Sequence, residues 1–391
     1  MISNRLWAFI LPLLFIHCVR PEPTNQDESD NTDPLKLLWQ RTNQESYNWG
    51  AYAPPLILGD SLLLTAGDGA IRCTSIDSGK TIWSSSYANI GFMNKRFVID
   101  QTHLYGFYGR EEVFAVKLSD GTQAWSALID SNREFGYADD IDASHYYVGV
   151  NSYGNIRRIM KFDKFTGELQ DTLRIDKMPW SLAYDSGSLY CNNGMSSGAN
   201  SLGRIICYEA NTLDSSWGYY SIGGTFSVCP SVVNDGVLYA GTVWGGSLGN
   251  EIVALNAETG ARLWRTSTTG CYQIVIHDEV LYYAGGSSVN ALDKNTGHVL
   301  WEAIIPTTDE SSPLAYWDGY VYKAHGGTLF VFDAETGERV YYTYTFDGKA
   351  EYVYQVSAGA GKIFVQTSQH LYALEPFNPD ALSPDHTASK L

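Results

Sequence analysis

Short apolar segments alternate with polar turns along almost the whole chain. The segments Pro230–Tyr239 and Pro313–Tyr322 each contain two such apolar runs, joined by a turn that carries Gly236 or Gly319. Runs of this length, rich in Val, Leu and Tyr and separated by Gly, Asn and Asp, are typical of β-strands joined by tight hairpins. The pattern therefore predicts an all-β fold.

A second pattern follows these hairpins. The segments Ala254–Trp264, Ala291–Trp301 and Val331–Tyr341 share the consensus A-L-D-x-x-T-G-x-x-x-W. The Asp or Asn can accept hydrogen bonds from nearby amides, and Gly can take the positive φ that a tight turn requires. The Trp is a large plate that can stack against a small residue of the next repeat. We interpret all of these residues as architecture rather than chemistry.

Weaker copies extend the repeat to most of the chain. Asp171 and Tyr341 stand where Trp is expected, and Leu213 stands where Gly is expected. The spacing of roughly 40 residues is that of a four-stranded propeller blade. The Trp positions of the copies are Trp39, Trp83, Trp125, Asp171, Trp217, Trp264, Trp301 and Tyr341.

The two ends of the repeat region complete each other. The last copy, Leu371–Glu375, runs into Pro376 without a Trp-bearing strand, whereas Lys36–Arg41 carries Trp39 but has no motif before it. A strand from one end pairing with the blade at the other would close the ring and remove two sheet edges. We expect an eight-bladed β-propeller over residues 35–376, followed by a disordered tail, 377–391.

These repeats resemble the PQQ-like (pyrroloquinoline-quinone) propeller family, in which the tryptophans form a girdle around the ring. The quinoprotein dehydrogenases share this propeller, but they typically have a longer chain, adjacent cysteines over the cofactor and a calcium-binding carboxylate set. None of the cysteines here are adjacent. The resemblance implies a fold and not bound PQQ, so we expect no cofactor.

Charge narrows the range of partners. The chain has 26 basic and 43 acidic residues, a net charge of -17. Nucleic-acid binding requires clustered Lys and Arg, so this class of partner is excluded. The acidity is best explained as keeping a Tyr-rich surface soluble.

The first residues resemble a bacterial lipoprotein precursor. Arg5 precedes the apolar run Leu6–Ile16, which is too short to span a bilayer, and Cys18 follows directly. We expect residues 1–17 to be a signal peptide, Cys18 to be lipidated, and residues 18–34 to form a disordered acidic tether. His17 departs from the small residue usual before the cysteine, so a differently cleaved or uncleaved signal is the alternative.

The remaining cysteines do not form a metal or redox motif. Cys191 and Cys207 fall on neighbouring strands of one expected hairpin, where an oxidising compartment could join them in a disulfide. The alternative is that all five are small buried hydrophobes. The set is Cys73, Cys191, Cys207, Cys229 and Cys271.

Catalytic candidates are few. At the starts of the expected innermost strands, the charged residues are Arg96, Asp139 and Asp140. Adjacent residues of a strand point to opposite faces, so the two carboxylates make a poor acid–base pair. The histidines are dispersed without metal-ligand spacing. We therefore expect no enzyme activity and no metal.

Aromatic residues mark one face of the ring. In a propeller, the loops between the second and third strands and those between blades share a face, and exposed aromatics there indicate recognition. Packing over the blades is the alternative for each residue. The sharpest prediction for a contact site is the pair of loops 192–203 and 242–250. The candidate partner-binding residues are Trp49, Tyr52, Phe135, Trp180, Trp244 and Tyr352.

Size, lipoprotein-like start and repeat type together resemble the BamB-type lipoproteins of the outer-membrane barrel-assembly machinery. This resemblance implies an exported, outer-membrane-anchored scaffold, periplasmic or surface-facing, that binds a protein partner and touches the membrane only through its lipid. We expect a monomer. A binding module for a carbohydrate or another protein is the alternative, and a PQQ-dependent oxidoreductase is a weaker one.

Overall fold

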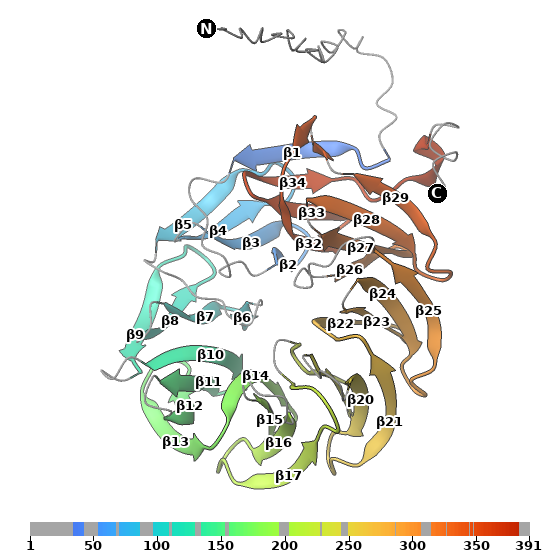
Figure 1. The fold of residues 1–391 in the computed structure, drawn as a ribbon. Helices are drawn as coiled ribbons and strands as arrows, with labels where there is room; N and C mark the ends of the chain where they lie inside the picture. Colours follow the sequence, from blue (N-terminus) through green and yellow to red (C-terminus); the bar gives the residue numbers. More distant parts are fainter. Residues whose placement is uncertain are drawn as a thin grey trace, which may run out of the picture.

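In the computed structural model, small antiparallel sheets form a closed ring (Figure 1). Cys18, Trp49, Tyr52, Arg96 and Trp244 lie outside the described residues, and for 134–137 and 152 only the backbone is described. The structure describes residues 34–42, 54–67, 70–86, 97–108, 112–129, 134–152, 156–194, 203–226, 229–243, 249–285, 287–305, 314–325, 327–343, 345–346 and 348–382.

Eight of the sheets have four strands each, and we number them as blades 1 to 8 along the chain. Blade 1 contains β2 (Leu56–Leu58), β3 (Leu62–Gly67), β4 (Ala70–Ser75) and β5 (Thr81–Ser86). Blade 2 contains β6 (Val98–Ile99), β7 (His103–Tyr108), β8 (Glu112–Lys117) and β9 (Gln123–Leu128). Blade 3 contains β10 (Glu134–Ile141), β11 (His145–Ser152), β12 (Arg157–Asp163) and β13 (Leu169–Ile175). Blade 4 contains β14 (Met178–Asp185), β15 (Ser188–Gly194), β16 (Arg204–Glu209) and β17 (Ser215–Tyr220).

The second half of the ring repeats this plan. Blade 5 contains β18 (Val232–Asn234), β19 (Val237–Gly241), β20 (Asn250–Asn256) and β21 (Arg262–Thr268). Blade 6 contains β22 (Gln273–His277), β23 (Val280–Gly285), β24 (Ser288–Asp293) and β25 (Val299–Ile304). Blade 7 contains β26 (Leu314–Trp317), β27 (Tyr320–His325), β28 (Thr328–Asp333) and β29 (Arg339–Thr343). Blade 8 contains β32 (Val353–Gly359), β33 (Lys362–Thr367), β34 (His370–Leu374) and β1 (Leu37–Thr42), and the short pair β30 (Thr345–Phe346) and β31 (Lys349–Ala350) precedes it.

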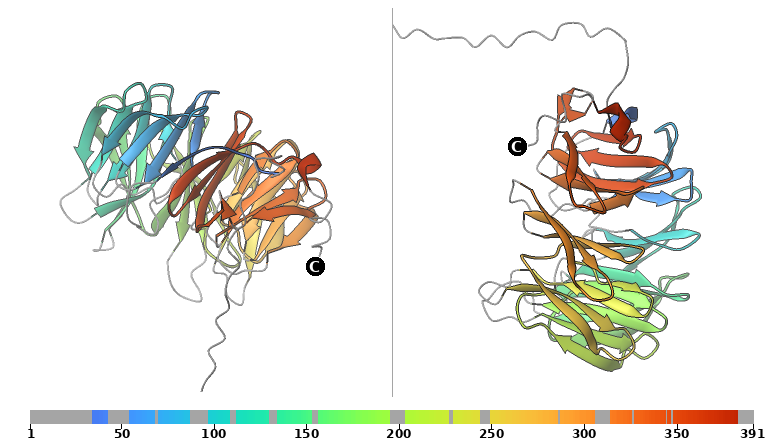
Figure 2. Two further views of the ribbon diagram at one scale, coloured as in Figure 1. Left: turned by 90° about the horizontal axis from the view of Figure 1, so that it is seen from above. Right: turned by 90° about the vertical axis from the view of Figure 1, so that its right-hand side faces the viewer.

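The strands of each blade run in order from the centre of the ring to its rim, and successive blades follow one another around it (Figure 1). Both side views show the first and last blades, blue and red, next to each other (Figure 2). The expected all-β, eight-bladed propeller is confirmed. The hairpin before each motif supplies the two inner strands, and the motif supplies the two outer ones.

Strand β1 closes the ring. It pairs antiparallel with β34, with Leu37 opposite Leu374 and Thr42 opposite His370. The predicted closure by the N-terminal strand is therefore confirmed, and residues more than 300 positions apart share one sheet.

The inner hairpins turn as their sequence indicates. Between β18 and β19, Asp235 has φ 52° and Gly236 has φ 74°. Two successive positive φ angles define a type I′ turn, whose twist matches that of the flanking strands. Gly236 has open space around it, so its backbone angle, and not a close neighbour, is what favours glycine there.

The hydrophobic core lies between the blades. One cluster joins Tyr105 and Val113 of blade 2 to Tyr146 and Phe162 of blade 3, and all four are buried. Other blade pairs are joined by similar clusters, so each sheet buries both faces and the blades stabilise one another. Within the described residues, no helix is long and apolar enough to cross a membrane.

The folded region extends beyond residue 376. Phe377 is buried, and its ring centroid lies 4.9 Å from that of Tyr320 and 5.8 Å from that of Tyr341. A short 3-10 helix, η2 (Pro379–Ala381), follows. The expected tail boundary at 377 is therefore wrong, because Phe377 fills a space between blades 7 and 8.

Candidate functional site

At six of the eight blade junctions, a tryptophan of the outer strand ties one blade to the next. Each indole N–H donates to a backbone carbonyl of the following blade's motif turn, at 2.7–3.2 Å. Trp39 on β1 makes this bond across the ring closure, to the carbonyl of Ile76 in blade 1. The pairs are Trp39–Ile76, Trp83–Leu118, Trp125–Lys164, Trp217–Ala257, Trp264–Lys294 and Trp301–Ala334.

The motif glycine is where the next blade meets the tryptophan ring. At Gly337, with φ 73°, an added Cβ would stand 2.6 Å from the Trp301 ring. Gly79 stands in the same relation to Trp39. Real Cβ atoms do not approach rings this closely, so glycine is required by contact as well as by φ.

The junction of blades 3 and 4 lacks both residues. Asp171 replaces the tryptophan and is exposed. Leu213 replaces the glycine, keeps φ 59° and is 3% exposed. The carbonyl at the position that an indole bonds elsewhere is that of Ala210, and it accepts from Tyr147 OH at 3.0 Å. Lys161 adds a second link, because its Nζ donates to the neighbouring carbonyl of Asn211 at 2.7 Å. The sequence shows the two substitutions but not these two donors.

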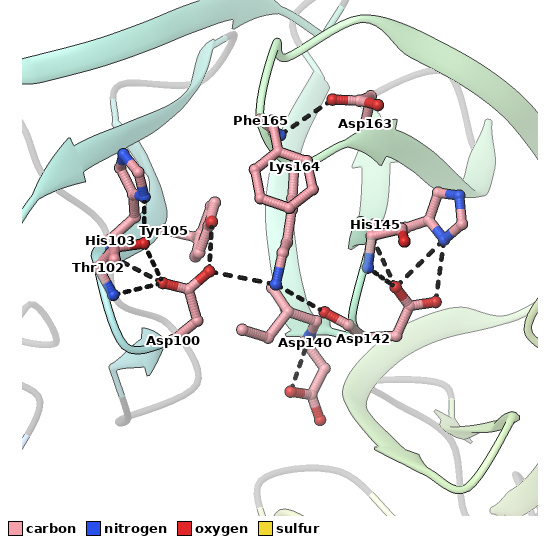
Figure 3. Close-up of polar contacts among 12 residues, drawn as sticks. Asp100, Thr102, His103, Tyr105, Asp140, Asp142, His145, Asp163, Lys164 and Phe165 are labelled. Atoms are coloured by element: carbon pink, nitrogen blue, oxygen red, sulfur yellow. Dashed lines mark hydrogen bonds and ion pairs between the residues drawn. The ribbon is translucent and has the colours of Figure 1, made fainter.

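A polar cluster joins the turns of blades 2 and 3 (Figure 3). The Lys164 ammonium lies 3.1 Å from Asp100 Oδ2 and donates to the carbonyl of Asp142 at 3.0 Å. Asp100 accepts from the amides of Thr102 and His103, both at 2.8 Å. Asp142 accepts in the same way in the next blade, and its Oδ2 lies 2.9 Å from His145 Nδ1.

These carboxylates are held in their charged form. Burial alone would raise the pKa of Asp100, but the hydrogen bonds from Thr102, His103, Tyr105 and Lys164 outweigh it and hold the pKa well below its ordinary value. A carboxylate that accepts this many bonds is a poor proton carrier. The cluster therefore fixes the hairpin turns and the blade junction.

The two adjacent carboxylates near the channel face different blades. Asp139 is buried and accepts from Tyr146 OH at 2.9 Å, on the blade 2 side. Burial and then the charge of Asp139 raise the pKa of Tyr146 well above its ordinary value, so this phenol stays a donor. Asp140 accepts from the amide of Tyr184 in blade 4 at 2.8 Å. The two carboxylates therefore point apart, which is what their adjacent positions on a strand predict.

Side chains of the inner strands also link neighbouring blades. Asn192 of blade 4 donates to the carbonyl of Cys229 at 3.1 Å and accepts from Ser231 at 2.8 Å. Gln273 of blade 6 accepts from the amide of Leu314 in blade 7 at 2.6 Å. These amides, at the channel mouth, are used for assembly, and they offer neither the carboxylates nor the adjacent cysteines that would fit PQQ. Among the described residues, no group of three or more His, Cys, Asp and Glu side chains is placed to hold a metal ion.

Beta-bulges place aromatic residues on the loop face, which is the face of the loops between blades. Trp180 is the extra residue of a bulge in β14, and its ring lies over Gly194. Tyr354 is the extra residue of a bulge in β32, and its ring centroid lies 5.0 Å from that of Tyr352. A bulge re-aims one side chain out of the sheet. Sequence reasoning missed Tyr354, because a bulge does not interrupt the apolar pattern.

The predicted face residues are only partly brought together. Trp180 and Tyr352 lie on one face, but in blades 4 and 8, on opposite sides of the ring (Figure 1). For Phe135 the backbone alone is described, in β10 of blade 3. Trp49, Tyr52 and Trp244 are outside the described residues, so they stay predictions.

A buried acid beside Tyr352 was also missed. Glu351 accepts from Tyr372 OH at 3.0 Å and lies 2.6 Å from His370 Nδ1. Thr367 also donates to Glu351. Its partners come from β34 and from the end of β33, so the cluster pins the loop that carries Tyr352 to blade 8. No sequence motif marks it, because the partners are brought together only by the fold.

The described cysteines are all buried, as their interpretation as small hydrophobes predicts, and no two of them are bonded in this structure. A disulfide between Cys191 and Cys207 is excluded by the register. Cys191 lies opposite Ile206 and Cys207 opposite Tyr190. The two side chains therefore enter different clusters, on opposite faces of the sheet.

Together, the ring, the Trp–Gly junctions and the motif turns define a PQQ-like β-propeller. A family model described as "Outer membrane protein assembly factor BamB" matches residues 35–219 and 203–375, and the chain belongs to this family.

Solved structures and curated proteins agree on the fold. The crystal structure of BamB from Moraxella catarrhalis has a TM-score of 0.63 at 13% identity, covering 87% of this chain and 99% of that one. Quinohemoprotein alcohol dehydrogenase ADHIIG from Pseudomonas putida HK5 has a TM-score of 0.65 at 12% identity, covering 88% and 77%. The lanthanide-dependent methanol dehydrogenase of Methylacidiphilum fumariolicum (strain SolV) is 32% identical over 130 residues, so the match spans 28% of this chain and 21% of that protein. Similarity this limited carries no activity from either dehydrogenase to this chain.

Proposed function

We propose that this protein is a non-catalytic scaffold of the cell envelope that binds a protein partner through its loop face and acts in outer-membrane protein assembly. The observation that carries the proposal is the family match across nearly the whole propeller. A fold alone does not fix a function, so the surface has to support it.

The two faces of the ring differ in what they offer a partner. The turn face consists of short, repeated turns whose Asp, Gly and carbonyl groups are already engaged in assembly, as at Asp333 and Gly337. The loop face carries the bulged Trp180 and the pair Tyr352 and Tyr354. Because hot spots concentrate in Trp, Tyr and Arg, the loop face is the better candidate.

The separation of these aromatics shapes the contact. Trp180 and Tyr352 lie in blades half a ring apart. A partner that used both would span the channel mouth, and a smaller partner would use one of them. We propose the site around Trp180 as the principal contact, since its ring lies against Gly194, a described residue of the predicted contact loop 192–203.

Anchoring at Cys18 belongs to the same proposal. A lipid at this residue, with the tether 18–34 behind it, would hold the ring near the membrane. Mass spectrometry of the mature protein should find a lipidated cysteine at its N-terminus, and an unmodified N-terminus elsewhere would contradict the anchor.

Crosslinking with matched variants tests the partner-binding face. We expect mild crosslinking of the membrane-anchored protein to capture a barrel-assembly subunit, and Trp180→Ala to weaken capture by more than about 1 kcal/mol. Trp244→Ala should do the same. Phe165→Ala is the control, because Phe165 is an aromatic of the turn face that is 61% exposed. If capture survives Trp180→Ala and Trp244→Ala but is lost in Phe165→Ala, the partner binds the turn face and the proposed loop-face site is refuted.

Binding of a carbohydrate is the second candidate. The rings of Tyr352 and Tyr354, 5.0 Å apart, provide the kind of aromatic surface on which sugars stack. Glycan binding that is lost in Tyr354→Ala but unaffected by Trp180→Ala would favour it. A PQQ-dependent oxidoreductase is the third candidate, and calcium-dependent, stoichiometric PQQ binding with alcohol or sugar turnover would establish it.

A further inference from the structure

Two buried thiols meet at the junction of blades 5 and 6. The Sγ atoms of Cys229 and Cys271 are 3.3 Å apart, and both residues are fully buried. Cys229 precedes β18 and Cys271 precedes β22, the innermost strands of their blades. The contact therefore joins the two blades next to their innermost strands.

The local packing holds Cys271 in this position. Its amide donates to the carbonyl of Thr242 at 3.0 Å. Its side chain also fills the space beside Gly241, where an added Cβ would overlap Cys271. Both cysteines belong to the cluster that contains Tyr239 and Trp264. Neither thiol can turn away without opening a cavity.

The neighbouring junctions show what is unusual here. Blades 4 and 5 are joined at the inner strands by Asn192, and blades 6 and 7 by Gln273, through ordinary hydrogen bonds. At the junction between them, the cysteine pair takes this place. A thiol is a weak donor and a weak acceptor, so the reduced pair links its blades less firmly than an amide does.

We propose that Cys229 and Cys271 are joined in a disulfide that ties blade 5 to blade 6. The two sulfurs would have to approach by about 1.3 Å to reach bonding distance. The two thiols give up two protons and two electrons, and the disulfide of an envelope thiol oxidase accepts them and becomes two thiols. The exchange passes through a mixed disulfide between one cysteine and the oxidase.

Burial determines when this exchange happens. No oxidase can contact a fully buried sulfur, and burial raises the pKa of Cys271 well above its ordinary value, which suppresses the reactive thiolate. The disulfide therefore forms before blades 5 and 6 close, and the closed ring then protects it. The proposal is independent of the partner and of the loop face, since it needs only an oxidising compartment.

Mass mapping of the full chain tests the disulfide. The chain is recovered from an oxidising compartment, denatured in acid, alkylated without reductant and digested. We expect a peptide pair linked through Cys229 and Cys271, and alkylation of Cys73, Cys191 and Cys207. Alkylation of both Cys229 and Cys271, or a link to another cysteine, would overturn the proposal.

Thermal unfolding gives a second measurement. A reductant present from denaturation through refolding should lower the melting temperature by on the order of 5 °C. The double variant Cys229→Ser/Cys271→Ser should lose this dependence, while Cys73→Ser, a buried cysteine of another cluster, should keep it. An equal response to reductant in both variants would also refute the disulfide. Partner capture is not read in either experiment, so failure here leaves the proposed function standing.

Discussion

The junction of blades 6 and 7 and the junction of blades 3 and 4 occupy the same place in the repeat but are built from different residues. In the first, the Trp301 ring covers Gly337 and bonds to the carbonyl of Ala334. In the second, Leu213 fills the space, Tyr147 OH donates to the equivalent carbonyl of Ala210, and Lys161 donates to the next one, that of Asn211.

The difference separates two reasons for glycine at this position, its positive φ and the lack of room for a Cβ. Leu213 has φ 59°, close to the 73° of Gly337. A positive φ costs a leucine only about 1–2 kcal/mol, which the fold tolerates here. The ring of the preceding blade, by contrast, leaves no room for a Cβ. Trp and Gly thus form a coupled pair, and losing the first removes the main requirement for the second.

Of the changes that test this comparison, removing a tryptophan should lower the free energy of unfolding most. We expect Trp301→Ala to lower the free energy of unfolding by about 3–5 kcal/mol, because a buried ring and its hydrogen bond are lost. Asp171→Ala, at the same repeat position, should change it by less than about 0.5 kcal/mol. Urea unfolding measures both, and equal losses would show that the two junctions do not differ.

Adding a side chain under the ring should come next. Gly337→Leu should cost roughly 2–4 kcal/mol from overlap with Trp301 and from backbone strain. Gly236→Leu is the control for strain alone, because Gly236 has φ 74° and open surroundings. The double variant Trp301→Ala/Gly337→Leu should lose about 1–3 kcal/mol less free energy of unfolding than the two single variants lose together. Strict additivity would contradict the coupling.

The lysine that links blades 3 and 4 should matter less. Lys161→Met keeps the aliphatic length but leaves the carbonyl of Asn211 without this donor, at a cost of about 1–2 kcal/mol. Lys117→Met, at an exposed position, should be close to neutral. If both variants unfold alike, the bond from Lys161 does not stabilise this junction.

The smallest effect concerns the junction of blades 2 and 3 and depends on pH. The folded-state pKa of Asp100 lies below its unfolded value of about 4. Its stabilisation is thus complete above the unfolded value and is lost as the pH falls through the folded one. Asp100→Asn should cost about 1 kcal/mol at pH 7 and progressively less below about pH 4. A difference in stability between the protein and the Asp100→Asn variant that widened in acid would contradict the assignment.

The sequence predicted the ring because its cause is local and repeated. Each copy of the motif carries its own turn and its own Trp, so a spacing of roughly 40 residues was enough to predict the blades and their closure. The boundary at Phe377 was missed because its packing partners, Tyr320 and Tyr341, lie in another blade.

The candidate site was harder to predict, because its residues, like Phe377, are brought together by contacts that do not repeat along the chain. The bulge that exposes Tyr354 is a matter of register, which the alternation of apolar residues does not reveal. Sequence reasoning paired Cys191 with Cys207 because they share a hairpin, whereas the thiols in contact, Cys229 and Cys271, are brought together by the angle between two blades. Apart from the repeated Trp–Gly junctions, contacts between blades leave no pattern in the chain.

The closure by β1 also has a consequence for how the protein is made. Strand β1 is synthesised first, but its partner β34 lies at the far end of the propeller and is synthesised last. Until then β1 has a free edge, and Trp39 lacks its contact with the ring of Phe364 in blade 8. The first strand of the propeller to be synthesised is therefore the last to pair, and pairing over so long a sequence separation is intrinsically slow. The time during which the chain is vulnerable to aggregation is set by this one strand.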